Sequence, residues 1–143
     1  MLRLLFLIVW AGLIFIYTCT SSLEELAETK QMNFRWTSET ALPEMLDPLP
    51  KNVSDDFILR KIGHGFVFFV FAIAVYGVAG SLAAAALVSL LYAFSTEVLQ
   101  LFFQRDGRLF DVMFDGAGIA AAVLFLLLSG AHLNTAKKHL EKW

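Results

Sequence analysis

Charged residues and cysteine are scarce in this sequence, and each shortage excludes certain kinds of protein. Only 17% of the 143 residues are charged and 58% are hydrophobic, far from the roughly 25% charged residues typical of soluble domains. The net charge of −2 provides no broad basic surface, so nucleic acid is not expected as a partner. A single cysteine, Cys19, excludes an intrachain disulfide, and no Cys/His spacing predicts a zinc site. We expect a membrane protein with no bound metal or cofactor.

Long apolar runs are what the sequence has in place of charge. Each run approaches the roughly 20 residues that a helix needs to cross the hydrocarbon core of a bilayer. The fold class we predict is all-α, an integral membrane four-helix bundle that forms one domain over residues 1–143. The first run has no small-x-small cleavage site after it, so we interpret it as a retained anchor rather than a signal peptide. The four predicted spans cover about residues 4–20, 62–79, 82–103 and 109–133.

The connections between these runs differ greatly in length. About residues 21–60 contain all three prolines, eight acidic residues and four basic residues, a composition that predicts a long extramembrane loop between the first and second helices. Only Gly80 and Ser81 separate the second run from the third. Such a short turn makes those two helices antiparallel neighbours.

Polar and ionisable residues gather at one end of the predicted bundle. Four antiparallel spans place their ends alternately on the two sides of the membrane, and residues three or four apart share one face of a helix. Three helices can therefore direct polar groups into one pocket on the side of the long loop, and we predict that this pocket binds the ligand. Its predicted residues are Lys61, His64, Ser95, Glu97, Gln100, Arg105, Arg108, Asp111 and Asp115.

Glu97 is the member of this set that is hardest to explain by structure alone. It lies inside an apolar span, where a charged residue costs roughly 2.5–3.5 kcal/mol at the helix centre and less near the interface. Glu97 and Asp115 should therefore face the bundle interior, and Arg105 and Arg108 are their expected partners. An intramembrane carboxylate of this kind is a functional candidate.

For other members of the set, a structural role is an equally good interpretation. Arg105, Arg108 and Asp111 could form an ordinary interfacial salt-bridge turn, and Lys61 could extend to the lipid head groups. A single histidine such as His64 is more often an interfacial residue than a ligand.

The type, spacing and order of these groups resemble those of the VanZ-like family of membrane proteins. The family takes its name from a member associated with resistance to the glycopeptide antibiotic teicoplanin. The resemblance therefore implies a bacterial plasma membrane location and a cell-envelope role, and it implies no reaction. Asp115 departs from the family pattern, where asparagine is more common. The matching groups are Lys61-Ile62-Gly63-His64 with Phe68, Ser95-Thr96-Glu97-Val98-Leu99-Gln100, Arg105-Asp106-Gly107-Arg108, and Asp111 to Gly118.

Two functions from different classes follow from these residues. In the first, the pocket binds a lipid-linked or peptidic ligand, such as an envelope precursor or a glycopeptide, with Lys61, Arg105 and Arg108 as anion contacts. In the second, the protein is an intramembrane enzyme acting on a lipid head group, with His64 as the acid or base and Glu97 or Asp111 as its partner.

Three further interpretations are weaker. A metal ion bound by His64 and the carboxylates finds no support in the spacing, which matches no known metal motif. A transporter would require a homo-oligomer, because four spans in one protomer are few. A purely structural membrane protein is the remaining alternative, and for it neutralising Glu97 would alter folding without removing a specific activity.

Orientation depends on the distribution of lysine and arginine. An even number of spans places both termini on the same side. The two polar loops hold seven basic residues, including Lys61, against four on the terminal side, which by itself would place the loops in the cytoplasm. The lysine cluster of the tail, at Lys137, Lys138 and Lys142, favours cytoplasmic termini instead. We expect both termini in the cytoplasm and the polar pocket on the outer side.

Overall fold

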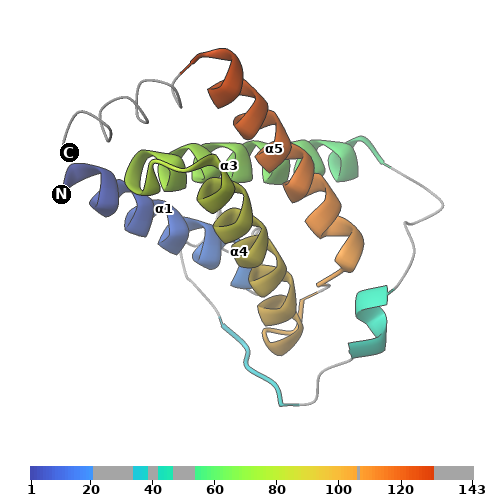
Figure 1. Ribbon diagram of the computed structural model, residues 1–143. Coiled ribbons are helices and arrows are strands. Elements are labelled where there is room, and N and C mark those ends of the chain that lie inside the picture. Colours follow the sequence, from blue (N-terminus) through green and yellow to red (C-terminus); the bar gives the residue numbers. More distant parts are fainter. Residues whose placement is uncertain (21–33, 39–41, 47–53, 106, 131–143) are drawn as a thin grey trace.

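The computed structural model of the chain describes residues 1–20, 34–38, 42–46, 54–105 and 107–130 (Figure 1). Within these residues, all regular structure is helical, and four of the helices are long and apolar enough to cross a membrane. The predicted all-α membrane bundle is therefore confirmed. Its elements are α1 (Leu2–Cys19), the 3-10 helix η1 (Leu42–Leu46), α3 (Asp55–Ala79), α4 (Leu82–Phe102) and α5 (Leu109–Leu128).

Helix α3 begins earlier than the sequence predicted. Ser54 caps it, because its hydroxyl oxygen accepts a hydrogen bond of 3.2 Å from the backbone N–H of Phe57. The helix thus starts within the segment of about residues 21–60 that the sequence assigned to the extramembrane loop, and Arg60 and Lys61 lie on it. The predicted end of the fourth span, at residues 131–133, lies outside the described residues.

The connection between α3 and α4 is as tight as predicted. Gly80 ends α3 in the left-handed conformation, with φ of 66°, and its N–H donates to the carbonyl oxygen of Tyr76. Ser81 then caps α4 through a 3.3 Å hydrogen bond from the backbone N–H of Ala84. A glycine followed by a serine is thus the C-cap of one helix and the N-cap of the next.

Hydrogen bonds from polar side chains join α1 to the rest of the bundle. The indole N–H of Trp10 donates to the carbonyl oxygen of Val67 on α3 at 3.1 Å. The hydroxyl of Tyr92 on α4 donates to the carbonyl oxygen of Ala11 at 2.7 Å. Because water is scarce inside a bilayer, polar groups there need protein partners. These two bonds make α1 a packed member of the bundle.

Helices α3 and α5 pack through two glycines. A Cβ atom on Gly118 would overlap the backbone of Gly65, and a Cβ atom on Gly65 would lie 3.2 Å from the carbonyl oxygen of Phe114. Small residues at a crossing allow helix backbones to approach closely within a membrane. The crossing carries His64, beside Gly65, toward the polar face of α5.

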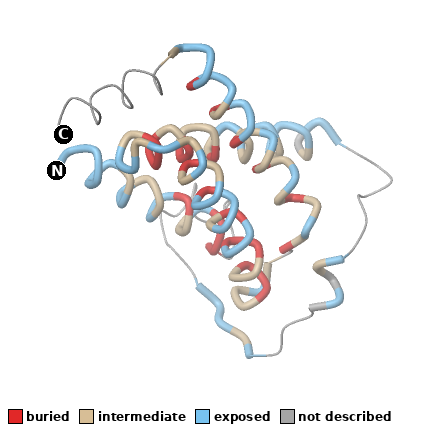
Figure 2. The backbone as a smooth tube through the Cα atoms, in the orientation of Figure 1, coloured by how far each residue is buried: buried red, intermediate tan, exposed pale blue. Residues whose placement is uncertain are grey.

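The outer surface of the bundle is apolar. Figure 2 shows buried residues where the helices meet and exposed residues along their outward faces. In each of the four candidate spans most residues are not buried inside the structure. Such a surface suits hydrocarbon rather than water. Examples of large exposed side chains are Leu5, Val9, Phe66, Leu91, Leu124 and Phe125.

Part of the long loop is attached to the end of α4. The N–H of Thr37 donates to the carbonyl oxygen of Phe102 at 2.8 Å, and the ring of Trp36 stacks on the ring of Phe102 with centroids 5.1 Å apart. Phe34 meets Phe103 edge to face, with centroids 5.8 Å apart. Residues 34–38 therefore lie at the end of the bundle opposite Met1 (Figure 1).

Candidate functional site

A polar pocket of about 490 Å³ opens at the loop end of the bundle. The ends of α1 and α4, the first turns of α3 and α5, and the α4–α5 connection all contribute to it. Six of the nine predicted site residues line it, so the structure brings together most of what the sequence placed there. The full lining is Tyr17, Thr18, Phe57, Arg60, Lys61, His64, Gln100, Gln104, Arg105, Arg108, Phe110 and Asp111.

Basic side chains dominate the charge of this pocket. Among the described residues that line it, Arg60, Lys61, Arg105 and Arg108 are basic and Asp111 alone is acidic. Lys61 and Asp111 form an ion pair, with Nζ and Oδ1 2.6 Å apart. Within the described lining, arginines outnumber acidic residues three to one, which favours an anionic group in the pocket.

Aromatic rings hold Lys61 in place from two helices. Its ammonium nitrogen lies 5.0 Å from the ring centroid of Phe57 and 5.3 Å from that of Phe110. Rings within about 6 Å of an ammonium attract it electrostatically. Together with the ion pair to Asp111, these contacts fix the position of the charge at the edge of the pocket.

Glu97 lies beneath the pocket and is 1% exposed. Its Oε2 accepts a 2.9 Å hydrogen bond from the backbone N–H of Arg108. The amide nitrogen of Gln100, one turn further along α4, lies 3.5 Å from Oε1. These contacts orient the carboxylate from the α4–α5 connection and from its own helix.

The predicted pairing of arginine side chains with the buried carboxylates was wrong. Arg105 directs its guanidinium to the carbonyl oxygen of Thr20 at 2.7 Å, and so joins the α4–α5 connection to the end of α1. Arg108 contacts Glu97 through its backbone N–H. The α4–α5 connection folds back over the end of α4. Its backbone N–H, and not an arginine guanidinium, therefore contacts the Glu97 carboxylate.

Asp115 faces His64 instead of an arginine. Asp115 is fully buried at 0% exposure, and its Oδ1 lies 3.6 Å from Nδ1 of His64. Glu97 lies close to both, because one donor atom of each of these three residues lies within 4.8 Å of the others. An imidazole and two carboxylates thus converge from α3, α4 and α5. This set can hold a proton or a cation between its members.

Ser95 lies outside the site, contrary to prediction. It is exposed on the outer side of α4, and its hydroxyl donates to the carbonyl oxygen of Leu91 at 2.7 Å. The next residue, Thr96, is the buried one, with its hydroxyl donating to the carbonyl oxygen of Ala93. Glu97 and Gln100 are three residues apart and share the inward face of α4. Ser95 is two residues from Glu97 and therefore lies on the outward face.

Several residues that line the pocket were not predicted from the sequence. Arg60 was assigned to the loop, although its place next to Lys61 was a signal that it belonged to the same helical turn. Tyr17 and Thr18 at the end of α1 have no such signal, because their approach to the pocket depends on how α1 packs. Gln104 has a positive φ of 54°, which the sequence does not reveal.

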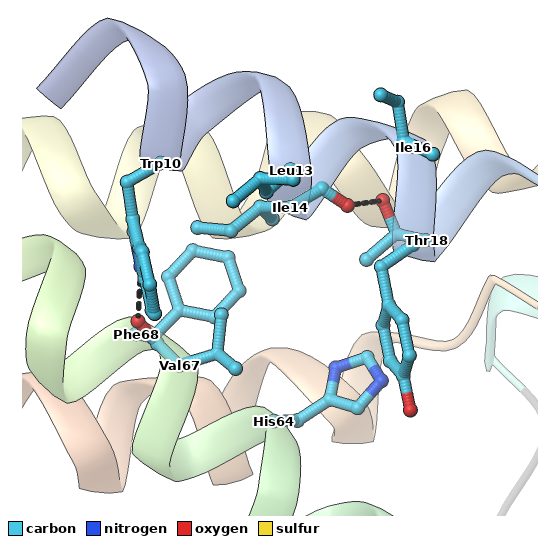
Figure 3. A pocket seen from close by; sticks show the side chains of 9 residues that line it. Trp10, Leu13, Ile14, Ile16, Thr18, His64, Val67 and Phe68 are labelled. Carbon is cyan, nitrogen blue, oxygen red and sulfur yellow. Dashed lines mark hydrogen bonds between the residues drawn. The ribbon is translucent and has the colours of Figure 1, made fainter. Parts of the chain in front are cut away.

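An apolar groove of about 280 Å³ lies directly beside the polar pocket, between α1 and α3 (Figure 3). Trp10, Leu13 and Ile14 of α1 face Val67 and Phe68 of α3 across it, with His64 at one end. The groove and the polar pocket share three lining residues, which are Tyr17, Thr18 and His64.

Comparison with known proteins places the chain in a family. The family model described as VanZ/LLP1 matches residues 3–130. The uncharacterized membrane protein YwnJ of Bacillus subtilis (strain 168) is 38% identical over 112 residues, which are 77% of this chain and 79% of that protein. No solved structure matches. With a family match that covers all four long helices and the polar pocket, the chain belongs to the VanZ/LLP1 family of membrane proteins.

Proposed function

We propose that this protein binds an anionic lipid-linked component of the cell envelope, with the head group in the polar pocket. The observation that carries the proposal is the described lining of that pocket, in which basic residues outnumber acidic ones: Arg60, Lys61, Arg105 and Arg108 against Asp111. Arginine guanidinium groups match the geometry of phosphate oxygens. A phosphate or pyrophosphate head group is the chemistry that such a lining suits.

The neighbouring apolar groove supports the lipid part of the proposal. A lipid bound in both places would lay its chain between α1 and α3 and its head group among the arginines. The two parts of the site meet at Tyr17, Thr18 and His64. Burial of hydrocarbon contributes about 0.8 kcal/mol for each methylene relative to water, although much less relative to the bilayer. Selectivity should therefore come mainly from the head group.

The proposed setting is the bacterial plasma membrane, with both termini in the cytoplasm and the pocket on the outer side. An outward pocket would meet lipid-linked envelope precursors after their transfer across the membrane. The family name is linked to teicoplanin resistance, so we propose that occupancy of this pocket reduces the action of teicoplanin. Arg60 is an exposed residue on the second turn of α3, lines the pocket and can report the orientation.

Lipid binding is tested most directly with purified protein in detergent. Addition of phosphatidylglycerol should raise the thermal unfolding midpoint more than phosphatidylcholine does, because a ligand that binds the folded state stabilises it. Arg60→Gln should reduce this difference, and Arg35→Gln, which removes an exposed arginine away from the pocket, should leave it unchanged. Equal shifts with both lipids, or equal loss in both variants, would contradict the proposal.

The envelope role is tested by drug susceptibility. Bacteria that express the protein should tolerate more teicoplanin than bacteria with an empty vector, and vancomycin should show a smaller change. Glu97→Gln keeps an oxygen that can accept the N–H of Arg108, so it should reach the membrane at the normal level. Loss of protection in that variant would support a role for the carboxylate. If the protein reaches the membrane at normal levels but gives no protection against teicoplanin, the proposed role is refuted.

Orientation has its own test. In a Cys19→Ala background, a cysteine introduced by Arg60→Cys should react with a membrane-impermeant maleimide in intact spheroplasts. Labelling that requires disruption of the membrane would reverse the proposed orientation.

A further inference from the structure

A buried set of three ionisable side chains lies beneath the polar pocket. His64 of α3, Glu97 of α4 and Asp115 of α5 come from three helices, and one donor atom of each lies within 4.8 Å of the other two. We propose that these three side chains bind one divalent transition-metal ion, Zn²⁺ or Mn²⁺. This inference stands apart from the proposed lipid ligand and needs none of its residues except His64.

Asp115 supplies an independent reason to expect a cation. It is 0% exposed, and among the described residues neither of its carboxylate oxygens has a hydrogen-bond partner. Nδ1 of His64, at 3.6 Å, is beyond hydrogen-bond length. A buried carboxylate with no donor is costly, and in apolar surroundings it requires a counter-charge or a proton. A metal ion between Asp115, His64 and Glu97 would provide the counter-charge.

The nearby basic groups have other contacts. Lys61 lies 2.6 Å from Asp111, and Arg105 donates to the carbonyl oxygen of Thr20. The set itself combines two carboxylates with one imidazole. Its excess of negative charge therefore has no nearby ammonium group devoted to it in the described part of the chain.

The surroundings of Glu97 resemble the outer shell of a metal ligand. Ligating carboxylates are usually held by hydrogen bonds from other groups. Oε2 of Glu97 accepts the backbone N–H of Arg108, and Gln100 approaches Oε1. The side chain is thus oriented by fixed neighbours before any ion binds.

The donor types point to the class of metal. One imidazole nitrogen with carboxylate oxygens suits Zn²⁺ or Mn²⁺ better than Ca²⁺, which prefers six to eight oxygen ligands. Zinc sites have ligand distances of about 2.0–2.2 Å, so the three side chains would close around the ion by small rotations. Glu97 and Asp115 are buried and His64 lines the polar pocket. A fourth coordination position would therefore face that pocket.

Metal content measured on the full chain in detergent tests this proposal. The chain has three histidines, so His132→Gln and His139→Gln are introduced first, and an affinity tag without histidine is used. After treatment with a chelator, the protein is incubated with ZnCl₂ or MnCl₂ and desalted, and bound metal is measured by mass spectrometry. One ion per chain is expected for at least one of the two metals.

Variants then locate the ion. His64→Gln, Glu97→Gln and Asp115→Asn preserve side-chain size, and each should weaken binding at least tenfold. Ser95→Ala, on the exposed side of the same helix as Glu97, should leave binding unchanged. Helical content and elution volume show whether each variant is folded. Less than 0.2 ion per chain for both metals, or equal binding by all variants, would overturn the proposal.

A spectroscopic measurement distinguishes metal bound at this site from loosely bound metal. It also tests the proposal if one of the variants fails to fold. Co²⁺ added to the chelator-treated protein should produce visible absorption bands that Zn²⁺ removes. Those bands should be absent in His64→Gln. If these bands never appear but lipid still stabilises the protein in the presence of chelator, the metal proposal fails and the proposed lipid function stands. The two proposals can therefore fail separately.

Discussion

Gly107 lies against Glu97 so closely that a Cβ atom at position 107 would overlap the carbonyl oxygen of Glu97. This contact brings the α4–α5 connection down onto the last turns of α4. In that position the next backbone N–H, of Arg108, reaches the side chain of Glu97 at 2.9 Å. The absence of a side chain at residue 107 therefore permits this contact between the α4–α5 connection and the end of α4.

Substitution of Gly107 by alanine should disturb both stability and the site. An extra methyl group in a closely packed position typically costs about 1–3 kcal/mol, and here it meets backbone that cannot rotate away. Thermal unfolding in detergent should show a lower midpoint for Gly107→Ala. Gly12→Ala is the control, since nothing lies within 4 Å of a Cβ atom there. Equal midpoints for the two variants would mean that the connection can shift without cost.

The crossing of α3 and α5 makes a second prediction. Gly118→Ala should destabilise the bundle, because its Cβ atom would overlap the backbone of Gly65. Gly116→Ala is a matched control two residues earlier on the same helix, where the nearest atom is a flexible Leu90 side-chain carbon at 4.0 Å. Unfolding midpoints of both variants, measured in the same detergent, should differ clearly. A stable Gly118→Ala would show that the helices can separate at this point.

The ion pair of Lys61 and Asp111 should behave as a coupled unit. Lys61→Met leaves the Asp111 carboxylate without its cation and should destabilise the protein by about 1–3 kcal/mol, below the 3–5 kcal/mol of fully buried pairs, because the two side chains retain 14% and 9% exposure. Adding Asp111→Asn should recover part of that loss. A double-mutant cycle of unfolding free energies measures the coupling. Additive effects would indicate that the pair contributes nothing to stability.

Ser95 should be dispensable despite its place in the family-like pattern. Its hydroxyl donates to the carbonyl oxygen of Leu91 on the exposed side of α4. Ser95→Ala should change stability by no more than about 0.5 kcal/mol and should leave the phosphatidylglycerol shift intact. Arg60→Gln, tested beside it, should reduce that shift. If Ser95→Ala lost the phosphatidylglycerol shift, Ser95 would have to be counted as a residue of the site.

The amino-acid sequence alone determined the architecture of this protein. Each apolar run is as long as a membrane-spanning helix, and the Gly80-Ser81 turn leaves the neighbouring helices only an antiparallel arrangement. The clustering of ionisable residues at one end follows from the same alternation of spans, so the polar pocket was also predictable. The start of α3 was not, because the Ser54 cap extends the helix into a segment whose composition resembles a loop.

Tertiary structure decided which polar groups meet. Helical spacing places residues on a face but does not fix the rotation of one helix against another. The approach of His64 to Asp115 could therefore not be read from spacing, and Ser95 was misplaced. The close approach at Gly65 and Gly118 sets the rotation of α3 against α5. The fold of the α4–α5 connection likewise gives Glu97 a backbone N–H in place of a guanidinium. The sequence thus determines the membrane bundle through hydrophobicity and length, and only packing contacts between helices decide the chemistry at its polar end.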